Sequence, residues 1–176
     1  MGRLTFNPVK HIDPIGSLFI IFAGFGWAKP VQFNPANLRH PRLDKAIIAA
    51  AGPLSNLLLA LVFIAIIRGW RALPDITSSE AVLTFFSSDF SITVLNIIFR
   101  ATMINLGLFI FNLFPIPPLD GSHIVFSGLN LKPETEILIM KVGGPLLFIT
   151  IIIQNTTELT ILPIGRLIFA MMNFLL

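Results

Sequence analysis

The chain contains no cysteine. Disulfide bonds, thiol nucleophiles and thiolate metal sites are therefore excluded from its chemistry. Histidine is also scarce: it occurs at positions 11, 40 and 123, and no His-Glu-x-x-His stands anywhere in the sequence. Because a catalytic zinc site normally takes three protein ligands, these scattered histidines do not by themselves predict one.

Charged residues are also scarce. Only 12% of the residues are charged, 55% are hydrophobic and the mean hydropathy is +0.85. An ordinary soluble domain carries about a quarter of its residues as charges, so this chain cannot cover a large core with a polar surface. The composition favours a multi-pass membrane protein whose main partner is the lipid bilayer. The net charge of +3 comes from few residues, which argues against nucleic-acid binding.

Long apolar runs place the expected helices; the first is uncharged, and the other three carry Arg100, Lys141 and Arg166. The clearest span is Ala46–Ile67, the second is Phe90–Phe114, the third is Ile137–Ile153 and a weaker fourth is Leu159–Leu176. The predicted fold class is an all-α, multi-pass membrane protein with three to four transmembrane helices. We expect residues 29–45 to form a polar connector before the first span and residues 69–89 to form a loop after it. Basic residues in the connector place residues 29–45 in the cytoplasm.

The region before the first span is less regular. Residues 14–28 are uncharged but make only about 22 Å of helix, short of a roughly 30 Å hydrocarbon core. A short re-entrant or interfacial segment is therefore expected here. A small β-hairpin near residues 3–10 and 29–33 completes the prediction for the N-terminal region.

A carboxylate follows the second span in an unusual setting. The stretch from Asn112 to Gly121 contains three prolines and places Asp120 directly before the glycine. Proline breaks helices, glycine permits unusual backbone angles, and an acid close to a membrane span is a functional-site hypothesis by default. The alternative is that Asp120 caps the helix that starts at Gly121, since aspartate is a favoured N-cap. The residues leave these two interpretations about even.

Amides inside the spans are the next candidates. Asn56 lies mid-span behind Gly52 and Pro53, where an alternative to function is a hydrogen bond across two closely packed helices. The same alternative applies to Asn105 and Asn112. His123 is three residues after Asp120 and could face a metal with it, but two ligands are too few, so an interfacial side chain is the expected role.

Taken together, these motifs resemble the site-2 protease family of zinc metallopeptidases, which are intramembrane proteases. The resemblance covers about residues 2–130 and lies in motifs that follow one another in the family's order. These are Phe6-Asn7-Pro8-Val9-Lys10-His11-Ile12-Asp13-Pro14-Ile15-Gly16, Gly24-Phe25-Gly26-Trp27-Ala28-Lys29-Pro30-Val31, Ala51-Gly52-Pro53-x-Ser55-Asn56 and Asn112-x-x-Pro115-x-Pro117-Pro118-Leu119-Asp120-Gly121.

The resemblance implies roles for particular residues. Asp120 corresponds to the third zinc ligand, and Asn56 lies on the helix that lines the active site, where it holds substrate or the developing oxyanion. Pro117 and Pro118 shape the broken helix end and contact substrate. The implied substrate is a transmembrane-helix protein, the implied cofactor is zinc, and a bacterial cell membrane is the expected location.

The sequence departs from the family at one point, because the His-Glu-x-x-His helix is missing. That helix carries two zinc ligands and the glutamate that activates water. We therefore expect residues 1–176 to form a single peptidase-like membrane domain that is truncated at its N-terminus and inactive as this chain alone. The alternatives are a non-catalytic protein that binds transmembrane helices, or a transporter fragment with broken helices.

Overall fold

The computed structural model describes residues 12–14, 16–18, 39–129, 131–157 and 159–175. Contacts divide the chain into two units, residues 1–38 and residues 39–176. In the first unit, positions 14 and 16–18 are helical and the Asp13 carboxylate accepts a hydrogen bond from the Gly16 amide at 3.0 Å. The rest of segment 14–28 lies outside the described residues. So do both arms of the expected hairpin, residues 3–10 and 29–33.

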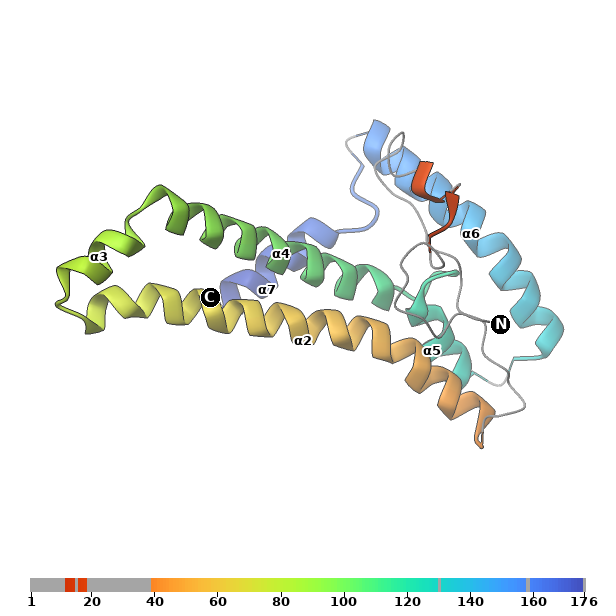
Figure 1. Ribbon diagram of the computed structural model, residues 1–176. Helices are drawn as coiled ribbons and strands as arrows, with labels where there is room; N and C mark the ends of the chain where they lie inside the picture. Colours follow the sequence, from red (N-terminus) through yellow and green to blue (C-terminus); the bar gives the residue numbers. More distant parts are fainter. Residues whose placement is uncertain (1–11, 15, 19–38, 130, 158, 176) are drawn as a thin grey trace. The chain divides into compact units, whose positions relative to one another are not determined.

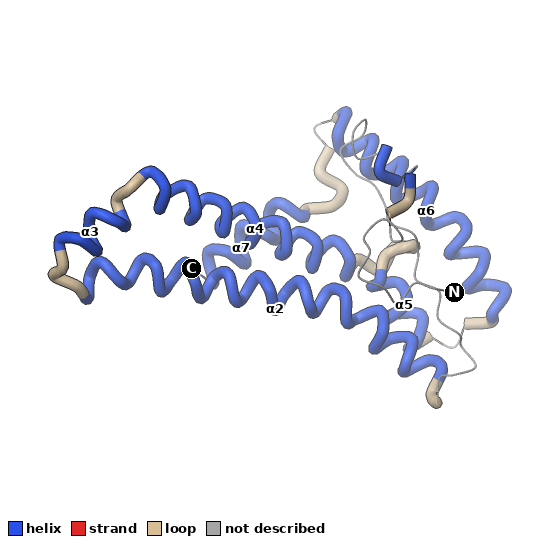
Figure 2. Tube along the Cα trace, viewed as in Figure 1, coloured by secondary structure: helices blue, strands red, loops and turns tan. Residues whose placement is uncertain are grey.

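The second unit is built from helices, and no strand occurs in its described part (Figures 1 and 2). The elements in chain order are α2 Pro41–Ile76, α3 Glu80–Phe86, α4 Asp89–Leu113, α5 Asp120–Gly128, α6 Pro133–Thr156 and α7 Ile164–Leu175. The helical class predicted from the sequence is confirmed.

Three of these helices, α2, α4 and α6, are long and apolar enough to cross a membrane. The expected fourth span is only the 12-residue helix α7, which is about 18 Å long. The residues before α7 are held in a turn, because the Gln154 side chain accepts hydrogen bonds from the backbone amides of Ile161 and Leu162 at 3.2 and 2.7 Å. The turn shortens the helix that residues 159–176 were expected to form.

Helix α2 is longer than the sequence predicted at both ends. Residues 41–45, expected in the polar connector, form its first turn, because Pro41 occupies a position where its missing N–H costs nothing. The prediction of a loop over residues 69–89 was also wrong. Helix α2 continues to Ile76, α3 follows, and Trp70 packs edge-on against Phe86 with ring centroids 5.0 Å apart.

Small side chains set the packing of the helices. Helices α2 and α4 run antiparallel side by side, and Ala60 of α2 meets Leu106 of α4 and Met172 of α7 in a cluster that excludes solvent (Figure 1). A Cβ atom at Gly107 would lie 3.4 Å from the Ile168 Cδ1 atom, so α7 rests directly on α4. Close backbone approach of this kind is typical of membrane helix packing.

Polar side chains within the spans bond to their own helices. The Asn105 amide donates to the Ala101 carbonyl at 2.8 Å, and the Asn112 amide donates to the Leu108 carbonyl at 3.0 Å. The Ser55 hydroxyl donates to the Gly52 carbonyl at 2.7 Å. Each carbonyl acceptor lies within the donor's own helix, so these hydrogen bonds of Asn105 and Asn112 are not the bonds across helices that the sequence offered as an alternative.

Candidate functional site

The helical structure is interrupted between α4 and α5, at the prolines that predicted an interruption in the sequence. Helix α4 ends at Leu113, and Phe114 is extended, with φ −61° and ψ 135°. Proline disfavours a helical conformation in the residue before it, so Pro115 accounts for this end. A cis peptide bond joins Pro117 to Pro118 within the break. The predicted interruption is confirmed, and it positions the next helix.

Gly121 is needed for space and not for an unusual backbone angle. It is the second residue of α5, and it carries no positive φ. A Cβ atom here would overlap the Leu113 carbonyl group and would lie 2.6 Å from the Phe114 carbonyl oxygen. The end of α4 and the start of α5 can therefore approach closely only because position 121 has no side chain.

Asp120 is the first residue of α5 and points its carboxylate at α2. Its Oδ2 atom lies 3.3 Å from the position a Cβ atom would take at Gly52. The residue at the N-cap is Leu119, and no side chain caps the helix, so the capping interpretation of Asp120 is wrong. The carboxylate accepts no hydrogen bond from any residue that the structure describes. Partial burial raises the pKa of Asp120, and the nearby His123 lowers it by less.

Asn56 lies one helical turn after Gly52 on α2. Residues four apart share a helix face, so Asn56 lies on the side of α2 that carries the contact between Gly52 and Asp120. Its side chain is half-buried. The spacing supports a shared pocket for Asn56 and Asp120, and their direct cooperation stays a prediction.

The two prolines assigned to substrate binding have different surroundings. Pro117 is buried, and a Cβ atom at Gly143 of α6 would lie 2.5 Å from its Cβ atom. Pro118 is exposed. Sequence reasoning missed the contact with Gly143, although the Gly143-Gly144 pair, which is unusual inside a span, was a usable signal.

His123 is more enclosed than the expected interfacial side chain. Its Nδ1 atom is buried and has no hydrogen-bond partner within the described part of the chain. An ion pair between Lys45 of α2 and Glu136 of α6 lies nearby. Burial lowers the pKa of His123 and the Lys45 charge lowers it further, whereas Glu136 and Asp120 raise it. The sequence could not show this grouping, because Lys45 and Glu136 are 91 positions apart.

The donor set fits zinc only in part. Asp120 offers a carboxylate, a normal zinc ligand, without a competing hydrogen bond. His123 offers a buried ring nitrogen. Among the described residues, however, no group of three histidine, aspartate or glutamate side chains could hold a metal ion. The described residues therefore do not complete a metal site, and the role of Asp120 as a zinc ligand stays a prediction.

Comparison with known proteins gives three findings. Residues 17–150 match Peptidase family M50. A Bacillus subtilis (strain 168) protein named "Putative zinc metalloprotease YwhC" is 40% identical over 126 residues, which are 70% of this chain and 52% of that protein. A Mycolicibacterium smegmatis (strain ATCC 700084 / mc(2)155) protein named "Putative zinc metalloprotease Rip2" is 28% identical over 159 residues, which are 86% of this chain and 54% of that protein.

The present chain thus spans about half the length of the curated relatives it matches. No solved structure matches it significantly.

Proposed function

The chain belongs to Peptidase family M50, the site-2 protease family, and we propose that it forms the part of an intramembrane zinc metallopeptidase that supplies the ligand Asp120. The proposal rests on the direction in which the Asp120 side chain points. It lies against Gly52 in the gap between α5 and α2, and no described residue donates a hydrogen bond to it. The proposed reaction is hydrolysis of a peptide bond within or near the membrane, in a transmembrane-helix protein.

Several features of the chain hold the carboxylate in place. Gly121 lets α5 start directly beside the end of α4, and Gly52 leaves room for the carboxylate on the face of α2. Zinc, when bound, polarises a scissile carbonyl and lowers the pKa of water. The 176 residues contain no His-Glu-x-x-His, so the ligand count predicts that this chain alone neither retains zinc nor cleaves substrate.

Asn56 is the proposed second contributor. An amide near the reacting carbonyl can donate a hydrogen bond to the developing oxyanion, and loss of one such donor costs about 10²–10³ in kcat. Pro118 is exposed beside the Asp120 segment, so it is the proposed contact for an extended substrate. Pro117 is covered by α6, and its part in substrate binding is to hold Pro118 in place. The proposed setting is a multi-pass protein of a bacterial cell membrane.

Metal analysis tests the proposal. The 176-residue chain, purified in detergent, should hold much less than one zinc per chain. A His-Glu-x-x-His helix fused ahead of Gly2 should restore zinc binding, and Asp120→Ala should then weaken it. Asp89→Ala, an aspartate at the start of α4, is the matched control and should leave the zinc content unchanged. Asn56→Ala in the fused protein should lower kcat about 10²-fold without lowering the zinc content.

Two outcomes would contradict the proposal. One tight zinc in each unmodified chain would mean that other residues build the site and that the ligand count is wrong. If the fused protein binds zinc equally well with Asp120→Ala, the assignment of Asp120 fails. Capture of helical peptides by the unmodified chain, without zinc, would support the non-catalytic alternative.

A further inference from the structure

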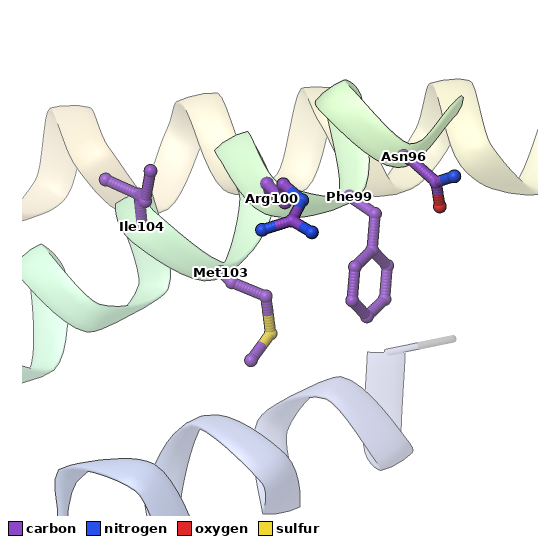
Figure 3. Close-up of a pocket in the computed structure, with 5 residues that line it drawn as sticks. All are labelled: Asn96, Phe99, Arg100, Met103 and Ile104. Atoms are coloured by element: carbon purple, nitrogen blue, oxygen red, sulfur yellow. The ribbon is translucent and has the colours of Figure 1, made fainter. Parts of the chain in front are cut away.

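Arg100 is the only charged residue of α4 apart from Asp89 at its start. Its side chain is exposed, and it forms no hydrogen bond or ion pair with the described part of the chain. It borders a groove of about 550 Å³ on one face of α4 (Figure 3). The groove is lined by Asn96, Phe99, Arg100, Met103 and Ile104. Phe99 and Met103 extend from this face toward α7.

A second groove adjoins the first. Its volume is about 330 Å³, and it is lined by Arg71, Phe99, Met103, Phe169, Met172 and Asn173. Phe99 and Met103 belong to both grooves. The two grooves therefore share these two apolar side chains, and each groove is lined by one arginine, Arg100 of α4 in the first and Arg71 of α2 in the second. Neither groove contains a carboxylate.

The alignment of α2 with α4 shows how deep Arg71 and Arg100 lie in the membrane, measured along the helix axes. Ala60 of α2 packs on Leu106 of α4. Arg100 lies about 9 Å along α4 from Leu106, and Arg68, where the uncharged stretch of α2 ends, lies about 12 Å from Ala60 in the same direction. Arg100 is thus within about 3 Å in depth of the end of the apolar stretch, and Arg71 is slightly beyond that end. Long basic side chains at this depth reach the membrane interface.

We propose that the two grooves together bind one anionic phospholipid, with its phosphate between Arg71 and Arg100 and its acyl chains over Phe99, Met103 and Phe169. The two arginines lie near the membrane interface, beside apolar side chains. This arrangement matches a ligand that is anionic at one end and apolar along the rest. A second copy of the chain is a poor match, because a symmetric contact places the same face of each copy together and would gather four guanidinium groups without an acid.

Native mass spectrometry of the detergent-solubilised chain, mixed with phosphatidylglycerol and phosphatidylcholine, tests the proposal. The chain should retain phosphatidylglycerol in preference to phosphatidylcholine. Arg71→Gln combined with Arg100→Gln should lower the retained phosphatidylglycerol about tenfold or more, since each basic side chain near a lipid phosphate contributes about fivefold. Arg71→Lys combined with Arg100→Lys should retain most of the binding.

The matched control is Arg166→Gln, which removes an exposed arginine of α7 that lines neither groove. It should leave lipid retention unchanged. Equal loss in this control would show that the charge of the whole surface binds lipid, and unchanged retention in the double glutamine variant would show that the arginines do not; either result overturns the proposal.

Two further competitors identify the ligand. Excess inorganic phosphate should not displace the lipid, because phosphate lacks acyl chains to cover the apolar side chains of the grooves. Full displacement would assign the site to a free anion and contradict the lipid proposal. A transmembrane peptide with one glutamate should bind more weakly than phosphatidylglycerol. If the peptide is retained through Arg100 and the lipid is not, the groove binds a protein helix and the proposal is wrong.

Discussion

Replacing Gly143 with alanine should loosen the attachment of α6 to the proline segment. The added Cβ atom would lie 2.5 Å from the Pro117 Cβ atom and 2.9 Å from the Pro117 carbonyl oxygen. Favourable carbon contacts lie near 3.5–4.0 Å, so the overlap is about 1 Å. Pro117 cannot rotate out of the way, because its ring is closed on the backbone. Helix α6 must therefore shift.

The magnitude is the balance of two opposing effects. Overpacking costs about 1–3 kcal/mol, whereas alanine is about 1 kcal/mol better than glycine inside a helix. Gly143→Ala should therefore destabilise the protein by up to about 2 kcal/mol. Gly144 provides the matched control, because a Cβ atom there meets only the Pro118 Cδ atom at 4.0 Å. Gly144→Ala should be neutral or should stabilise the protein by up to about 1 kcal/mol.

The assay is unfolding by sodium dodecyl sulfate in mixed micelles, followed by circular dichroism. The propensity gain is common to both variants, so their free energies of unfolding should differ by the overpacking cost of about 1–3 kcal/mol, with Gly144→Ala the more stable. Equal stability of the two variants, or a more stable Gly143→Ala, would refute the reasoning. It would mean that α6 does not rest on Pro117 in the membrane.

Two further predictions concern other contacts of the same region. Gly121→Ala should abolish or severely reduce folding, because its Cβ atom would overlap the Leu113 carbonyl group, whereas Gly128→Ala, with nothing within 4 Å, should be tolerated; thermal unfolding of the two variants makes the comparison. The ion pair of Lys45 with Glu136 should contribute no more than about 1 kcal/mol, since both side chains are 29% exposed. A double-mutant cycle of Lys45→Met and Glu136→Gln measures this coupling, and a value well above that figure would contradict the expectation.

The sequence predicted those parts of the fold that depend on local chemistry. Long apolar runs gave the positions of α2, α4 and α6, and Pro115 gave the end of α4. The extension of α2 to Ile76 was missed, because polar residues beyond Ile67 were taken to end a helix as they end a membrane span. In the structure, α2 continues past that point, where Trp70 packs on α3.

The site was predictable only in outline. Asp120 could be singled out by its place behind the prolines, but its contact with Gly52 depends on how α5 packs against α2. The role of Gly121 was predicted for the wrong reason, since a close contact leaves the same signature in a sequence as an unusual backbone angle. His123 was taken as interfacial because the residues that enclose it are distant in the sequence.

The internal hydrogen bonding of the spans has a consequence for what holds α2 and α4 together. Ser55, Asn105 and Asn112 each bond a carbonyl of their own helix. None of these bonds has to break when α2 and α4 move apart. Separation of the two helices is then opposed by lost van der Waals packing around Ala60 and Leu106, a loss that lipid tails or an incoming helix can replace. Separation of α2 from α4 would therefore leave the polar groups of these three side chains hydrogen-bonded.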